Sequence, residues 1–141
     1  MRKVWMAVGS AMLLVLLAYS QVRAGNEAPV QRFGSVIGVK EEKIPYYKEL
    51  HAACWPGVLA KIKECNIQNY SIYLHQLDDG QYYLFSYFEY AGTDFEADMK
   101  KMAADEETQR WWKETDPCQF PVKHRKEGEA WASMEEVFHC E

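Results

Sequence analysis

The sequence lacks long basic runs, long hydrophobic runs and metal-ligand patterns. Its longest basic cluster is residues 123–126 (KHRK), and the 141-residue chain has a net charge of −5. Because clustered Lys and Arg drive binding to a phosphate backbone, we expect no nucleic-acid partner. The four cysteines and four histidines show no zinc-site spacing, so we expect no metal. No Gly-rich phosphate loop, Ser-His-Asp order or internal repeat stands out either.

The longest uncharged apolar run is residues 11–18 (AMLLVLLA), well short of the ~20 residues that a spanning helix needs. It follows a basic start (MRK), and residues 22–24 (VRA) place small residues where signal peptidase requires them. This pattern is typical of a secretory signal over residues 1–24. We therefore expect an exported protein, periplasmic or secreted, with no stable membrane span after cleavage. An uncleaved N-terminal anchor is the alternative.

Cleavage would leave 141 − 24 = 117 residues, enough for one small domain. Residues 25–31 (GNEAPVQ) are typical of a flexible leader, and residues 32–141 form the expected domain. Because the signal carries three of the basic residues, the net charge moves from −5 to −8. An acidic chain of this kind fits a neutral small molecule or a protein partner.

The pattern of apolar residues predicts alternating strands and helices. Pro56 lies inside the longest helical pattern and should kink or break it. Asp79-Gly80 between two aromatic runs predicts a hairpin, and Thr93 or Asp94 can cap the helix that follows. The expected elements are a strand at 33–39, a helix at 43–65, strands at 70–77 and 82–90, helical pieces at 95–103 and 105–114, and a last strand within 130–139.

This β-α-β-β-α-β order predicts an α+β fold of the ferredoxin-like type, with a four-stranded antiparallel sheet and helices on one face. Aromatic residues occupy both faces of the predicted hairpin, so the second sheet face also needs cover. In a domain of this size a second subunit is the expected cover, and we predict a homodimer.

The cysteines do not define a disulfide pattern. Cys54 and Cys65 fall on the predicted 43–65 helix, where eleven residues separate them by roughly 16 Å, too far for a bridge. A pair such as Cys118–Cys140 stays open.

The candidate site residues are aromatic side chains around one histidine. Tyr47 and His51 lie one turn apart on the same helix face, although a lone His in an apolar stripe is more often a core residue. The neighbouring aromatic residues favour a pocket around His51, because Trp55 lies a further turn along the helix and Tyr70 can reach the same cavity. Two adjacent indoles, Trp111 and Trp112, are either core and interface residues or a stacking platform for a sugar. Solvated or incidental roles are expected of His75, His124 and His139.

Four ordered motifs resemble those of the L-rhamnose mutarotase family. Residues 47–56 (YKELHAACWP) match YxxxHxxxWP, and residues 69–74 (NYSIYL) match NYxIYL. Residues 109–112 are QRWW, and residues 136–138 are EVF. The spacings stay in register from about residue 32 to the C-terminus.

This resemblance implies a dimeric ferredoxin-like α/β barrel that interconverts the α and β anomers of a deoxyhexose such as L-rhamnose without a cofactor. It implies that His51 is the proton donor and that Tyr47, Tyr70, Trp111 and Trp112 contact the sugar. The chain departs from the family in its export signal and at Ala52, where rhamnose enzymes often have Asn. These departures bear on which sugar is physiological.

Mutarotation requires a proton at the ring oxygen and loss of one from the anomeric hydroxyl. We expect His51 to donate the first, Tyr47 to orient it or relay a proton, and Tyr70 or water to accept the second. Two other classes fit the same pattern. One is a ferredoxin-like dimeric monooxygenase or haem-binding enzyme, and the other is a non-catalytic carbohydrate-binding module.

Overall fold

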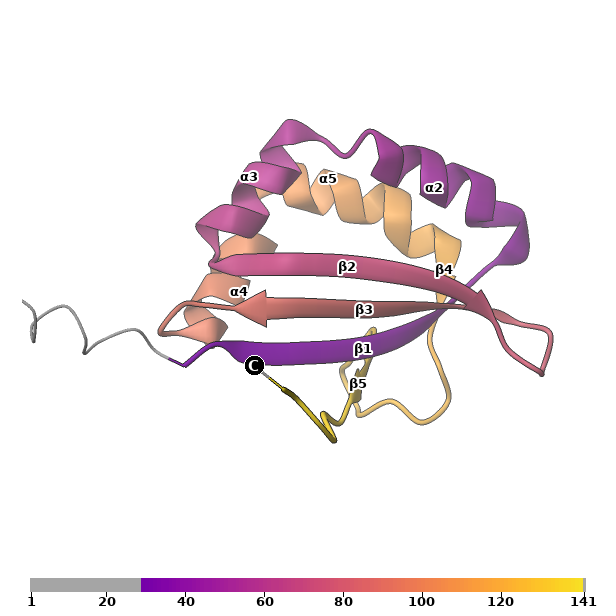
Figure 1. The fold of residues 1–141 in the computed structure, drawn as a ribbon. Coiled ribbons are helices and arrows are strands. Elements are labelled where there is room, and N and C mark those ends of the chain that lie inside the picture. The colour runs from indigo at the N-terminus through magenta and orange to yellow at the C-terminus, as the bar shows by residue number, and fades with distance from the viewer. Residues whose placement is uncertain (1–28, 141) are drawn as a thin grey trace, which may run out of the picture.

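The computed structural model describes residues 29–140, which form one antiparallel sheet with four helices on one face (Figure 1). The predicted signal peptide at 1–24 lies outside the described residues. Of the predicted leader, only residues 29–31 are described, and Gln31 is already the first residue of a strand. No helix in the described part of the chain is both long enough and apolar enough to cross a membrane.

The sheet is built around a central strand, β1, which pairs along its full length with β3. Strand order is β2-β3-β1-β4, with β5 also on β1, and every pairing is antiparallel. This order and the helices on one face make the fold ferredoxin-like, as predicted. The elements are β1 Gln31–Val39, η1 Glu41–Lys43, α2 Ile44–Ala52, α3 Pro56–Glu64, β2 Ile67–Gln76, β3 Tyr82–Tyr90, α4 Phe95–Ala103, α5 Glu106–Thr115, η2 Asp116–Cys118, β4 Gln119–Phe120 and β5 Ala132–Met134.

The fourth strand position differs from the prediction, because two short strands share it. β4, predicted as loop, pairs with Gly38 and Val39, and β5 pairs with residues 34–36 of the same edge. Pro121 follows β4 and has no N–H to extend the ladder. The predicted last strand is shortened to three residues, and an ion pair of 3.1 Å between Arg32 Nε and Glu136 Oε2 holds the segment that follows.

The predicted 43–65 helix is two helices, and Pro56 is the first residue of the second. Proline suits this position because its missing N–H would have no partner there. Cys54 therefore lies in the break, and the expectation that it shares a helix with Cys65 is wrong. Cys54, Cys65 and Cys118 are free thiols. The Cys118–Cys140 bridge that the sequence left open is therefore not formed.

The core lies between the sheet and the helices. Ile37 and Val39 of β1, Leu84 of β3, Tyr47 and Cys118 form its buried cluster. Alternate strand residues point into it, which is the period-2 arrangement expected of a sheet with helices on one face only. Aspartates cap both helices of the second pair, Asp94 for α4 and Asp105 for α5.

The opposite side of β1, β2 and β3 is called the open face below, and no helix of residues 29–140 lies over it (Figure 1). Its aromatic residues include Tyr73 of β2, which is 64% exposed. The segment after β5 adds Val137 and Phe138, 88% and 81% exposed. An apolar surface of this kind is characteristic of an interface.

Gly38 allows β4 to lie against β1. A Cβ atom at Gly38 would overlap the ring of Phe120, whereas the nearest atom to a Cβ at Gly34 would be the flexible end of Met134, at 3.2 Å. We expect Gly38→Ala to lower the free energy of unfolding by about 1–3 kcal/mol, because overpacking forces the ring to move. Gly34→Ala, the matched control, should cost clearly less in the same urea titration. In the double variant Gly38→Ala/Phe120→Ala the glycine change should cost little. Equal losses at Gly34 and Gly38 would contradict this account.

Candidate functional site

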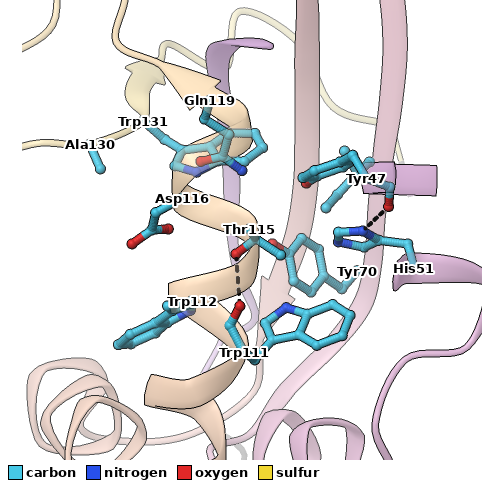
Figure 2. Close-up of a pocket in the computed structure, with 11 residues that line it drawn as sticks. Tyr47, His51, Tyr70, Trp111, Trp112, Thr115, Asp116, Gln119, Ala130 and Trp131 are labelled. Carbon is cyan, nitrogen blue, oxygen red and sulfur yellow. Dashed lines mark hydrogen bonds between the residues drawn. The ribbon is translucent and has the colours of Figure 1, made fainter. Parts of the chain in front are cut away.

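A cavity of about 360 Å³ opens between α2, β2 and α5. Ligand pockets in proteins are commonly of this size. All five residues predicted from the sequence line it, and they come from three elements that are far apart along the chain (Figure 2). The lining consists of Tyr47, His51, Tyr70, Trp111 and Trp112, together with Ile72, Thr115, Asp116, Gln119, Ala130 and Trp131.

His51 is held by a hydrogen bond between its Nδ1 atom and the backbone carbonyl of Tyr47, one turn earlier, at 2.8 Å. A carbonyl oxygen can only accept, so Nδ1 must carry the proton. In the neutral ring the other nitrogen, Nε2, then has a free lone pair, and Figure 2 shows that side of the ring toward the cavity. The hydrogen bond therefore selects the tautomer of His51.

Aromatic contacts fix the orientation of the same imidazole ring. The Tyr47 ring stacks on it with centroids 4.2 Å apart, and the Trp111 indole meets it edge-on at 5.2 Å. Burial among these rings lowers the pKa of His51, and the hydrogen bond to Tyr47 opposes that effect more weakly. At neutral pH the ring is therefore uncharged and ready to accept a proton at Nε2.

The two phenols of the cavity are suited to donate hydrogen bonds while keeping their protons. Burial raises the pKa of Tyr47, with a further contribution from neighbouring Tyr70 and a smaller opposing one from a hydrogen bond with Gln119. Burial of the ring also raises the pKa of Tyr70, with a smaller contribution from Cys54. Although 45% of the Tyr70 surface is exposed, its ring points into the cavity between His51 and Trp111 (Figure 2).

The paired indoles do not form one continuous platform. Figure 2 shows Trp111 and Thr115 on one side of α5, and Trp112 and Asp116 on the other. Trp111 is 6% exposed and belongs partly to the core, whereas Trp112 is 37% exposed. This follows from the rotation of about 100° between adjacent helix residues. The indoles provide two separate walls of the cavity.

Trp55 does not line the cavity, although its spacing suggested that it would. It lies in the break before α3, where its ring meets the far side of the site as an edge contact with Trp111 at 5.4 Å. The Arg110 guanidinium lies over the Trp55 ring, 5.7 Å from its centroid. Trp55 therefore packs against Trp111 without lining the cavity itself.

Several lining residues were missed in the sequence. Thr115 and Asp116 lie one turn after the two indoles, so the same four-residue spacing that linked Tyr47 to His51 could have found them. Gln119 belongs to β4 and Trp131 to the segment before β5, and no local pattern places either at the site. Among the described residues, Asp116 is the only acidic side chain in the lining, and partial burial raises its pKa.

The other histidines do not contribute to this cavity. His75 lies on the open face of β2, and His124 and His139 follow β4 and β5 in the chain. Within residues 29–140, no group of His, Cys, Asp and Glu side chains is arranged to hold a metal ion.

This domain has a ferredoxin-like fold and one oriented histidine in an aromatic cavity. These features are typical of proteins that bind or transform a small molecule. The family model of L-rhamnose mutarotase matches residues 32–140. The chain belongs to the L-rhamnose mutarotase family, and the resemblance seen in its motifs is confirmed.

Curated relatives and a solved structure agree with this assignment. An L-rhamnose mutarotase of Bacillus subtilis is 34% identical over 88 residues, covering 62% of this chain and 79% of the relative. One from Oceanobacillus iheyensis is 30% identical over 112 residues, covering 79% of this chain and 100% of the relative. The crystal structure of an L-rhamnose mutarotase from Formosa agariphila has the same fold, with a TM-score of 0.57 at 22% identity, over 79% of this chain and 99% of that one.

The state of His51 can be measured directly. We expect NMR of the folded protein to show a proton on Nδ1 and a pKa below the ordinary value of about 6.5. Because the unfolded chain then binds more protons in this range, the contribution of His51 to stability is present above pH ~6.5 and is lost as the pH falls toward the lower folded pKa. A His51→Gln variant should lack this part of the pH dependence. A raised pKa, or a proton on Nε2 in the neutral ring, would contradict the assignment.

Proposed function

We propose that this protein is an isomerase that interconverts the α and β anomers of L-rhamnose. One observation supports this most strongly: the neutral, oriented His51 offers its Nε2 atom to a cavity with aromatic walls. Membership of the L-rhamnose mutarotase family favours this activity over a monooxygenase or a non-catalytic binding module.

The reaction moves one proton between two oxygens on the same carbon. As the C1–O5 bond breaks, the hydroxyl on C1 loses its proton and becomes the aldehyde oxygen, and O5 gains a proton. Nε2 of His51 accepts the first proton because the resting ring is neutral. The imidazolium so formed then protonates O5. After rotation about C1–C2, the reverse steps close the ring on the other face of the aldehyde.

This order changes the role that the sequence suggested for His51. The sequence-based hypothesis had His51 begin as the proton donor to the ring oxygen. Because the hydrogen bond to the Tyr47 carbonyl and the lowered pKa leave the ring neutral, it begins as the acceptor and donates only afterwards. The phenols of Tyr47 and Tyr70, whose pKa values are raised, remain protonated and can hydrogen-bond to sugar oxygens.

The walls of the cavity suit a deoxyhexose. Such a sugar has hydroxyl groups at its edges and C–H groups on its faces and at its methyl group. The indoles of Trp111 and Trp112 and the side chain of Ile72 supply apolar contacts, and Gln119, Thr115 and Asp116 supply polar groups. Aromatic rings with a few polar groups are the usual lining of small-molecule sites.

The activity can be tested by NMR saturation transfer between the anomeric protons of L-rhamnose, with L-fucose and D-sugars as the comparison panel. We expect exchange of L-rhamnose above the blank and a loss of about 10²–10⁴-fold in His51→Ala, the usual contribution of general acid–base catalysis. Activity should fall as the pH drops through the lowered pKa of His51, because protonation removes the acceptor.

His124→Ala is the matched control, since it removes a histidine outside the cavity and should leave the exchange rate unchanged. If no sugar exchanges faster than the blank, the protein is not a mutarotase. If exchange survives in His51→Ala, the catalytic assignment is wrong even though the activity stands. Activity that falls as the pH rises through the His51 pKa would restore the donor-first order.

We also propose that the protein is exported and acts as a homodimer. The N-terminal sequence pattern supports export, and the exposed apolar residues of the open face support a second copy as its cover. Burying Tyr73, Val137 and Phe138 in such an interface would remove a large apolar area from water.

Native mass spectrometry of protein recovered from outside the cytoplasmic membrane tests both points. We expect a subunit that starts at Gly25 and a particle of twice the subunit mass. Tyr73→Lys should shift the particle to the monomer, because it places a charge on the open face. Leu59→Lys, an exposed apolar position in the helical layer, should not. A full-length subunit would contradict cleavage, and a wild-type monomer would contradict the dimer.

A further inference from the structure

Strand β2 contains one residue more than its partner β3 beside the cavity. Gln68 lies opposite Glu89, and Ser71 lies opposite Tyr87, so three steps along β2 match two steps along β3. The extra residue is accommodated at Asn69, whose φ angle of 50° lies in the left-handed region. This combination defines a β-bulge.

The bulge changes which residues of β2 face the helices. Ile67, before it, is 7% exposed and points into the core. In a regular strand, residues 69 and 71 would follow it on that face, and residue 70 would lie on the open face. Because of the extra residue, Tyr70 and Ile72 face the helices instead and line the cavity. The Tyr70 ring accordingly meets Phe88, on the helix side of β3, at 5.7 Å.

Both the backbone and the side chain of Asn69 favour this geometry. Asparagine tolerates the left-handed conformation better than other residues except glycine, whereas β-branched residues avoid it. The Asn69 amide also donates to Glu89 Oε2 at 2.7 Å, and Gln68 donates to the same oxygen at 3.0 Å. These bonds lower the pKa of Glu89, which therefore stays an anionic acceptor on the partner strand.

From this geometry we propose that Asn69 is a positioning residue, whose left-handed bulge turns the Tyr70 phenol into the sugar cavity and thereby sets the affinity for the sugar. Asn69 itself does not line the cavity, so it acts through Tyr70. The proposal rests on the mutarotase activity above only for its kinetic readout, since the orientation of Tyr70 can be measured separately.

The kinetic test replaces Asn69 with residues that differ in their tolerance of the left-handed conformation. Asn69→Val should raise KM for L-rhamnose about tenfold with little change in kcat, because a binding contact is lost while His51 is untouched. Asn69→Gly should keep KM within about threefold of the wild type, because glycine adopts the same φ without cost. In the Tyr70→Ala background, Asn69→Val should cause no further loss.

Asn66→Val is the matched control. Asn66 also has a left-handed φ, of 58°, and bonds Asp98 at 2.7 Å, but it precedes β2 and shifts no register. It should lower stability without raising KM. A rise in KM equal to that of Asn69→Val, equal losses in Asn69→Gly and Asn69→Val, or losses that multiply with Tyr70→Ala would each overturn the proposal.

A second readout needs neither activity nor sugar. We expect a 3-fluorotyrosine at position 70, followed by fluorine NMR, to titrate above its value in the unfolded chain in both the wild type and Asn69→Gly. In Asn69→Val its pKa should return toward the unfolded value, since the ring leaves the crowded cavity. An unchanged titration in a folded Asn69→Val protein would overturn the proposal. If the wild type exchanges no sugar but the titration behaves as expected, only the proposed function fails.

Discussion

The cavity depends on the break that Pro56 imposes between α2 and α3. A single helix over residues 43–65 would run as one rod across the sheet, whereas proline has no N–H for the hydrogen bond that a continuing helix requires. α2 therefore ends at Ala52, and α3 starts again in a different direction (Figure 1). The break leaves Tyr47 and His51 on a short helix facing β2 and α5, and it places Trp55 where its indole supports Trp111. Pro56 thus accounts both for the position of α2 beside the cavity and for the contact of Trp55 with Trp111.

Elements with strong local patterns could be predicted from the sequence. β3 was predicted with the bounds that the structure gives it, because its aromatic run follows an Asp-Gly turn, and α4 begins where Asp94 can cap it. β4 could not be predicted in this way, because its two residues form a strand only by pairing with Gly38 and Val39. The bulge in β2 could not be predicted either, since a local pattern carries no information on how many residues lie opposite on the partner strand.

The site shows the same division. Tyr47 and His51 were found because helical spacing brings them together. Tyr70 and the paired indoles were also candidates from the sequence pattern, and the family motifs supported all five. The spacing of adjacent helix residues already indicated that the two indoles could not face the same way, but it did not reveal that Gln119 reaches Tyr47 from β4. The protonation state of His51 could be inferred only from the three-dimensional structure, because it follows from one backbone carbonyl and the burial of the ring. Tertiary contacts therefore decide whether His51 begins as the proton acceptor or as the donor.

The buried thiols have a consequence for the export proposed above, which would place the chain in an oxidising compartment. Cys65 is fully buried and Cys118 is 1% exposed, and burial raises the pKa of both. Thiol–disulfide exchange requires a thiolate that can reach its target. Folding therefore removes both cysteines from redox chemistry without any bridge being formed. If the chain is exported as proposed, the vulnerable period is the interval between translocation and folding, when the same thiols are open to mispairing, so rapid folding would protect the reduced protein.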